Sequence, residues 1–66
     1  MEPNERLSAW LKAANMTQAE MARKCGYDRG NFHRLLNGKL RPSLHLAFAI
    51  ERETKGAVPA DAWVRQ

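Results

Sequence analysis

The sequence is poor in cysteine. Cys25 is the only cysteine in 66 residues, so this chain alone can form neither a disulfide framework nor a cysteine-based zinc site. A single unpaired thiol is typical of proteins that stay in the reducing interior of a cell, and we therefore expect a cytoplasmic location.

Long apolar runs are missing as well. The longest uninterrupted one, Leu46–Ile50, has five residues, whereas a helix that spans a membrane needs about 20. The start of the chain, Met1–Leu11, carries three charged side chains and lacks the apolar stretch of a secretion signal. We expect neither a membrane segment nor export.

The chain has little material for a core. Apolar residues make up 44% of it and aromatic residues only 8%. A chain of this length buries only about 60% of its unfolded surface, which leaves no room for the cleft that most catalysis needs. The sequence therefore predicts a single domain over residues 1–66 and favours a protein that is not an enzyme.

Residues that could carry catalysis or bind a metal are few and badly spaced. His33 and His45 lie twelve positions apart, and no Asp, Glu or Cys stands where it would complete a tetrahedral site with either. Ser43 is better explained as a helix cap, and Cys25 as a buried apolar residue beside Gly26. Because no glycine-rich phosphate-binding motif occurs either, we expect no metal and no cofactor.

Positive charge is concentrated in the middle of the chain. Residues 23–41 contain six basic side chains and one acidic one, Asp28, whereas the remainder contains five basic and six acidic residues. The net charge of +4 therefore arises in less than a third of the sequence. Such a segment attracts polyanions through counterion release and long-range steering. Nucleic acid becomes the leading partner, with a merely solvated basic surface as the alternative.

Helix signals divide the chain into four helices and a C-terminal segment. No stretch alternates apolar and polar residues over more than a few positions, so the pattern predicts an all-α bundle of four to five helices. The expected helices cover about 5–15, 18–24, 29–37 and 44–55, with Asn4, Thr17, Asp28 and Ser43 as their N-caps. Residues 57–66 form either a helical turn over Pro59–Trp63 or a short strand marked by Val58 and Val64.

Apolar spacing predicts how these helices pack. The first helix has a single apolar stripe, consisting of Leu7, Trp10, Leu11 and Ala14. The fourth has two faces, because Leu44 and Phe48 project away from the side that carries Leu46, Ala47, Ile50 and Thr54. One face should close the core, and the other either packs on the first helix or contributes to a dimer contact.

The segment Gln18–Leu35 has the spacing of two short helices that cross steeply. Such a crossing needs a small residue at the contact, a turn residue with positive φ four positions later, and an apolar anchor in the second helix. Ala22, Gly26 and Phe32 meet these requirements. The inward positions are then Met21, Ala22, Cys25, Phe32, Leu35 and Leu36, and the outward ones are Arg29, Gly30, Asn31, His33 and Arg34.

Residues 17–42, TQAEMARKCGYDRGNFHRLLNGKLRP, resemble the helix-turn-helix of the phage Cro and lambda-type repressor family. The resemblance rests on the TQAE opening, the A-x-x-x-G spacing and the L-x-N-G-K-x-R-P exit, which together rarely arise by chance. The tail IERETKGAVPADAW, residues 50–63, also resembles the last part of small regulators of this family. A helix-turn-helix at about residues 17–37 is therefore expected.

The resemblance implies a role for each matching position. The third helix would enter the major groove of duplex DNA while the second crosses above the backbone. Base edges would be read by Arg29, Asn31, His33 and Arg34. The sugar-phosphate backbone would be held by Gln18, Asn37, Lys39 and Arg41, with Gln18 also bracing a recognition side chain.

Gly30 departs from the family pattern, which often has a polar side chain at this early position of the recognition helix. It cannot read a base. Its missing side chain either lets the backbone approach the groove closely or only costs helix stability, about 1 kcal/mol relative to alanine.

The resemblance implies a sequence-specific, duplex-binding transcription regulator of phage or prophage type. A Cro-type repressor would act by occupying its operator as a homodimer, in the cytoplasm and associated with the nucleoid, with half-sites about 34 Å apart. The alternative is an antitoxin or protein-interaction module that captures a partner protein through Leu44, Phe48 and Val64.

Overall fold

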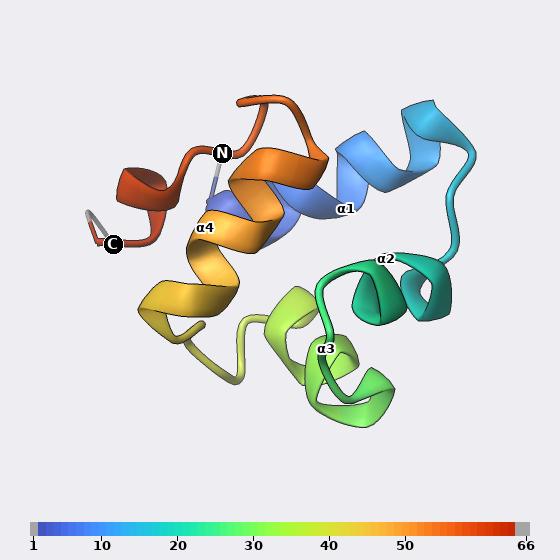
Figure 1. Cartoon of the computed structure of the whole chain (residues 1–66), viewed down its shortest axis with the longest axis horizontal. Coiled ribbons are helices and arrows are strands. Elements are labelled where there is room, and N and C mark those ends of the chain that lie inside the picture. Colours follow the sequence, from blue (N-terminus) through green and yellow to red (C-terminus); the bar gives the residue numbers. More distant parts are fainter. Residues whose placement is uncertain (1, 65–66) are drawn as a thin grey trace.

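The computed structural model describes residues 2–64, and all of its regular elements are helical (Figure 1). They are α1 (Pro3–Ala14), α2 (Gln18–Lys24), α3 (Arg29–Leu36), α4 (Leu44–Glu53) and the 3₁₀ helix η1 (Ala60–Trp63). No strand occurs in this part of the chain. The predicted all-α bundle of four to five helices is confirmed. None of these helices has the length and apolar character that crossing a membrane requires.

Three helices begin at the predicted N-caps, each of which accepts a hydrogen bond from a backbone N–H of the first turn. Such a bond satisfies one of the donors that a helix leaves free at its start. The acceptors are Thr17 Oγ1, bonded to the Glu20 amide at 3.1 Å, Asp28 Oδ2, bonded to the Asn31 amide at 2.9 Å, and Ser43 Oγ, bonded to the Leu46 amide at 3.1 Å.

The first helix starts earlier than predicted. Its N-cap is Glu2 rather than Asn4, and the Glu5 carboxylate accepts a hydrogen bond from the Glu2 amide at 3.0 Å. Pro3 can occupy the first helical position because its missing N–H would have no partner there. The Asn4 side chain instead donates to the Leu36 carbonyl at 3.2 Å, so it joins the start of α1 to the end of α3.

The last turn of α4 also ends two residues before the predicted Lys55. The Thr54 hydroxyl donates to the Ile50 carbonyl at 2.7 Å and accepts from the Val58 amide at 3.2 Å. The chain then turns through two left-handed residues, Lys55 (φ +56°) and Gly56 (φ +87°). A buried threonine therefore fixes where the helix stops and where the C-terminal segment departs.

The C-terminal segment contains a helical turn, so the strand alternative for residues 57–66 is wrong over the described part, and residues 65–66 lie outside it. Glu51 of α4 accepts a hydrogen bond from the Ala60 amide at 2.7 Å and so holds the start of η1. Val58 and Trp63 are buried, as expected if this turn delivers Trp63 to the core.

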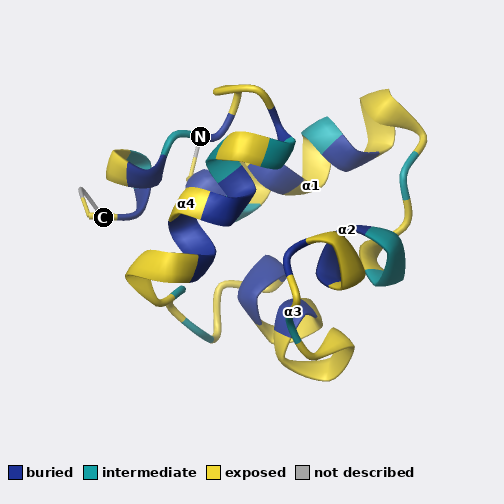
Figure 2. Cartoon of the chain, in the orientation of Figure 1, coloured by how far each residue is buried: buried dark blue, intermediate teal, exposed yellow. Residues whose placement is uncertain are grey.

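One apolar core joins all five elements (Figure 2). The predicted stripe of α1 is only partly correct, because Leu7 and Leu11 are buried, Trp10 is half-buried and Ala14 is exposed. The core consists of Leu7, Leu11, Met21, Ala22, Cys25, Phe32, Leu35, Leu36, Leu46, Ala47, Ala49, Ile50, Val58, Ala60 and Trp63.

Candidate nucleic-acid interface

A glycine turn sets the relation of α2 to α3. Gly26 has φ +66°, and the Tyr27 amide donates to the Ala22 carbonyl at 2.8 Å, which closes the end of α2. Apart from the residues next to it in the chain, nothing would lie within 4 Å of a Cβ at Gly26, so this position needs glycine for its backbone conformation and not for space. The predicted positive φ is confirmed, and the chain leaves α2 in the direction that starts α3.

Burial decides which side of α3 faces solvent. All six positions expected to point inward are buried, and Phe32 and Leu35 have no exposed surface. Figure 2 shows the buried side of α3 toward the other helices and its exposed side turned away from them. The five positions expected to point outward are all exposed, namely Arg29, Gly30, Asn31, His33 and Arg34.

Three of these outward side chains make no hydrogen bond or ion pair with any residue in 2–64, namely Arg29, Asn31 and Arg34. The backbone N–H of Asn31 is used by the Asp28 cap, which leaves its side-chain amide available. Two guanidinium groups and one amide on a single helix face are the groups that bind guanine and adenine edges best. These three side chains are therefore available to bind a partner from outside the described chain.

His33 links two other residues of the interface. Its Nδ1 lies 3.0 Å from Gln18 Oε1 at the start of α2, and its Nε2 lies 3.1 Å from Asn37 Nδ2, just after α3. The structure thus brings together one expected base reader and two expected backbone contacts. The Asn37 contact was missed by the sequence interpretation, although two residues four apart lie on the same side of a helix.

Lys39 and Arg41 lie in the segment after α3, and their side chains differ in hydrogen bonding. Gly38 has φ +75°, and the Lys39 amide donates to the Arg34 carbonyl at 2.9 Å, so Lys39 stands at the end of α3 with an exposed side chain. Arg41 Nη2 donates to the Trp63 carbonyl at 2.8 Å. Arg41 is therefore tied to η1, although its guanidinium keeps other N–H groups that this bond does not use.

Gly30 lies near the middle of the exposed side of α3. At about 100° per residue, Arg29, His33 and Arg34 surround it on the helix surface. A Cβ here would lie 3.2 Å from Asp28 Oδ2, the atom that caps the helix. The absent side chain therefore leaves a low point in the exposed face and space for the cap.

The basic segment 23–41 has no internal neutralisation by ion pairs. Within residues 2–64 the ion pair that forms, Arg52 with Glu53 at 3.7 Å, lies in α4, outside this segment. The segment's acidic residue, Asp28, is used as the cap of α3. The positive charge therefore faces solvent over α2, α3 and the loop that follows them.

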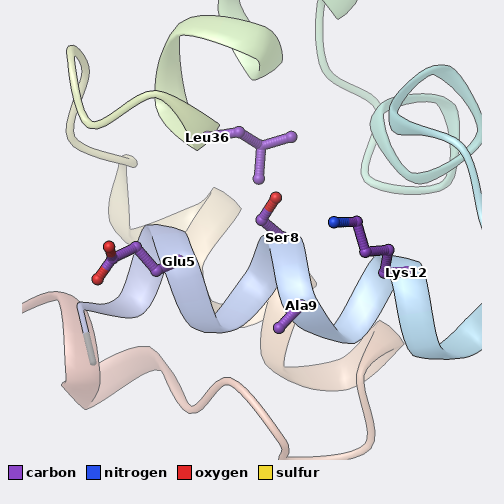
Figure 3. A pocket seen from close by; sticks show the side chains of 5 residues that line it. All are labelled: Glu5, Ser8, Ala9, Lys12 and Leu36. Atoms are coloured by element: carbon purple, nitrogen blue, oxygen red, sulfur yellow. The ribbon is translucent and has the colours of Figure 1, made fainter.

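Two other kinds of candidate site, a metal centre and an activated serine, can be compared with the side chains of residues 2–64. No three His, Cys, Asp or Glu side chains of the described chain gather as a metal site would require. Ser8 lines a hollow of 330 Å³ between α1 and the end of α3, with Glu5 and Lys12 on either side and Leu36 above it (Figure 3). No histidine lines this hollow to activate the serine hydroxyl.

Cys25 is buried, and its Sγ lies 3.7 Å from Met21 Sδ. Burial raises the pKa of the Cys25 thiol; the Glu53 carboxylate raises it further, and the Arg52 guanidinium opposes the rise. The thiol is therefore kept in its unreactive protonated form, which fits its interpretation as a small apolar core residue.

Comparison with known proteins gives one match. A family model described as helix-turn-helix matches residues 7–56, which run from α1 to the turn after α4. A search of curated proteins and a search of solved structures found no match.

Proposed function

The chain belongs to the Cro/lambda-repressor-like family of helix-turn-helix DNA-binding transcription regulators, and from this premise we propose that it is a Cro-type repressor that binds its operator as a homodimer. The observation that carries the proposal is the exposed, unpaired basic face of α3 on a helix-turn-helix scaffold. Repression by occupancy requires only that the bound protein exclude RNA polymerase from the promoter.

In this proposal α3 lies in the major groove and reads bases through Arg29, Asn31 and Arg34. A guanidinium can bond guanine O6 and N7 together, and an asparagine amide can bond adenine N6 and N7. The low point at Gly30 supports a close fit, because the helix backbone there meets the floor of the groove without an intervening side chain. His33 lies on the same exposed face of α3.

Contacts to the DNA backbone are assigned to Gln18, the first residue of α2, and to three residues that follow α3, namely Asn37, Lys39 and Arg41. These contacts fix the register of α3 without reading sequence. Lys39 is the best placed of them, since its side chain is exposed and has no partner within residues 2–64. Arg41 contributes with the N–H groups that its bond to Trp63 leaves free.

Homodimer formation is assigned to an apolar patch, which we call the α4–η1 patch and define as Leu44, Phe48 and Val64. Their exposed fractions are 69%, 53% and 72%, and a hollow of 270 Å³ lies among them. Trp63 lines an adjoining hollow, and its buried indole N–H has no hydrogen-bond acceptor among the described residues. A two-fold axis through this patch would cover apolar surface on both copies at once.

The proposal is tested by selection from a pool of random duplexes, followed by footprinting upstream of the protein's own coding region. We expect enrichment of a pseudo-palindrome whose half-sites lie about one helical turn apart, near 34 Å. Protection of that sequence in a promoter and loss of transcription from it would support repression. Recovery of random sequence alone, at low and moderate salt, would contradict sequence-specific binding.

The same patch favours one alternative function, an antitoxin or protein-interaction module that captures a partner protein. Gel filtration together with a binding assay on the isolated protein distinguishes the two. A repressor is a homodimer that binds its operator unaided, whereas an interaction module binds DNA weakly until its partner is added. A function at an operator would place the protein in the cytoplasm, in association with the nucleoid.

A further inference from the structure

The amide side chains of Gln18 and Asn37 are held by the same imidazole ring. Gln18 Oε1 lies 3.0 Å from Nδ1 of His33, and Asn37 Nδ2 lies 3.1 Å from its Nε2. The three exposed side chains come from the start of α2, the body of α3 and the residue after α3. They form a continuous hydrogen-bonded chain across the helix-turn-helix.

The chemistry of the two amide atoms fixes the state of the ring. A carboxamide oxygen only accepts hydrogen bonds, so His33 Nδ1 must carry a proton to bond Gln18 Oε1. A carboxamide nitrogen only donates, so His33 Nε2 must be bare to accept from Asn37. Both bonds exist together only in the neutral ring with its proton on Nδ1, because a protonated ring has no acceptor.

We propose that His33 is a positioning residue, held as the neutral Nδ1–H tautomer, which orients the amides of Gln18 and Asn37 toward the DNA backbone. The DNA part of this inference rests on the function proposed above. With both ring nitrogens used inside the protein, His33 donates no hydrogen bond of its own to a base. Sequence reading then falls to Arg29, Asn31 and Arg34.

The orientation matters because phosphate oxygens only accept hydrogen bonds. With its oxygen bonded to His33, Gln18 presents its amide N–H groups outward, and these are the groups that a phosphate can bind. Asn37 likewise keeps one N–H free while the other is held by the ring. Without His33 both amides would rotate freely and would have to be ordered when DNA binds, at a cost in affinity.

The tautomer is measured on the free protein by ¹⁵N NMR of the neutral histidine rings. We expect His33 to show a protonated Nδ1 and a bare Nε2. His45 is the internal control, because it is exposed on α4, has no hydrogen bond to residues 2–64, and should take the Nε2–H form that free imidazole side chains prefer in water. Finding His33 in the same form as His45 would overturn the inference.

Replacement of Gln18 supplies a second readout on the free protein. In Gln18→Ala the ring loses the acceptor that holds its Nδ1 proton, so the His33 pattern should move toward that of His45. The His45 signals should stay where they are. An unchanged His33 pattern would mean that Gln18 does not set the tautomer.

Affinity for the selected operator tests the positioning role through a double-mutant cycle. Each single variant, Gln18→Ala and His33→Ala, should weaken binding roughly 3- to 10-fold, as expected for loss of one or two ordinary hydrogen bonds. The operator affinity of the double variant should be about that of the single variant that binds more weakly, since the two residues act as a unit. Strictly multiplicative losses would overturn the coupling while leaving the proposed function intact.

Conservative variants of His33 separate its hydrogen bond with Gln18 from its hydrogen bond with Asn37. His33→Asn keeps a donor near the position of Nδ1 and should retain the Gln18 bond, whereas His33→Gln keeps an acceptor near Nε2 and should retain the Asn37 bond. Each should recover part of the affinity that His33→Ala loses, and His45→Ala should bind as the wild type does. If neither variant recovers affinity, the positioning role is wrong; if the wild type binds no duplex at all, the proposed function fails with it.

Discussion

Arg34 and Lys39 have the same charge but different settings. Arg34 lies on the exposed face of α3, whereas Lys39 follows its last turn, where the Lys39 amide is bonded to the Arg34 carbonyl. A side chain in the groove meets base edges, and one at the end of the helix meets the phosphates beside it. The two residues should therefore affect affinity and specificity differently.

Arg34→Ala should cost about 1 to 3 kcal/mol on the operator and relax the preference at one base pair. Lys39→Ala should weaken operator and random duplexes alike and reduce the slope of log affinity against log salt by about one unit. Titrations at several salt concentrations measure both effects. Arg6→Ala, which removes a charge outside the basic segment, is the control. Equal losses on operator and random DNA for Arg34→Ala would exclude a reading role.

Cys25 should react slowly with reagents that require a thiolate. Burial raises the pKa of its thiol, so the folded state favours the protonated form over the range in which an exposed thiol ionises. A folded-state pKa above the unfolded value gives a stabilising contribution that is complete at lower pH and is lost as pH rises through the folded pKa. Stability should thus fall above about pH 8.5, the ordinary thiol value.

The measurements for Cys25 are the rate of alkylation by iodoacetamide and urea unfolding, each as a function of pH. In Cys25→Ala the alkaline fall in stability should be smaller than in the wild type, even though the variant is less stable overall because it leaves a small cavity. Alkylation at neutral pH as fast as that of a free thiol would show that the side chain is accessible and ionised.

At the scale of elements, α3 depends on its first turn. It is only eight residues long, includes Gly30, and starts at the Asp28 carboxylate, which accepts from the Asn31 amide at 2.9 Å. Short helices gain little from their own backbone bonds and rely on caps and packing. The cap therefore holds the end of the helix that carries Arg29 and Asn31.

Asp28→Ala should lower the free energy of unfolding by about 1 kcal/mol, because it leaves a helix donor without its partner. Asp28→Asn is the matched control: it keeps an acceptor that caps nearly as well and removes the same negative charge. Urea unfolding of the three proteins measures the difference. Equal losses for the alanine and asparagine variants would assign the effect to charge and not to capping.

At the scale of the whole molecule, the proposed recognition face and the α4–η1 patch lie on different elements, and Arg41 lies beside the patch, in one hollow with Leu44 and Val64. In Figure 1, α2 and η1 lie toward opposite ends of the view, with α4 between them. The bond from Arg41 to the Trp63 carbonyl joins the loop after α3 to η1, and so connects the two regions. Two copies joined through the α4–η1 patch would leave both α3 helices exposed.

Phe48→Glu should convert the protein to a monomer, because a buried charge with no counter-charge opposes association. Affinity for the palindrome should fall at least roughly tenfold, since the second half-site no longer binds as part of the same molecule. Sedimentation equilibrium and operator titration measure these effects. Ala13→Glu, at an exposed position of α1, adds the same charge elsewhere and should leave both unchanged. A wild-type protein that stays monomeric on its operator would contradict the dimer.

Local signals in the sequence were sufficient to predict the helices and the turn of the helix-turn-helix. The caps Thr17, Asp28 and Ser43 and the turn at Gly26 each act within a few residues, through one hydrogen bond or one backbone angle. Apolar spacing likewise gave the inward and outward sides of α3, because a helix repeats its faces at fixed intervals. Which positions of α3 are exposed depends on this local information alone, whereas the base contacts expected of them came from the family resemblance.

The tertiary structure decided those features that depend on contacts between residues far apart in the sequence. Asn4 binds the Leu36 carbonyl instead of capping α1, Arg41 binds the Trp63 carbonyl, and Gln18 meets His33 across the turn. Each pair lies 15 to 32 positions apart in the sequence, so no local propensity or periodicity could identify it. The sequence thus determined the helices and the composition of the exposed face, whereas packing of the helices determined which polar side chains hydrogen-bond to distant parts of the chain and hold the fold together.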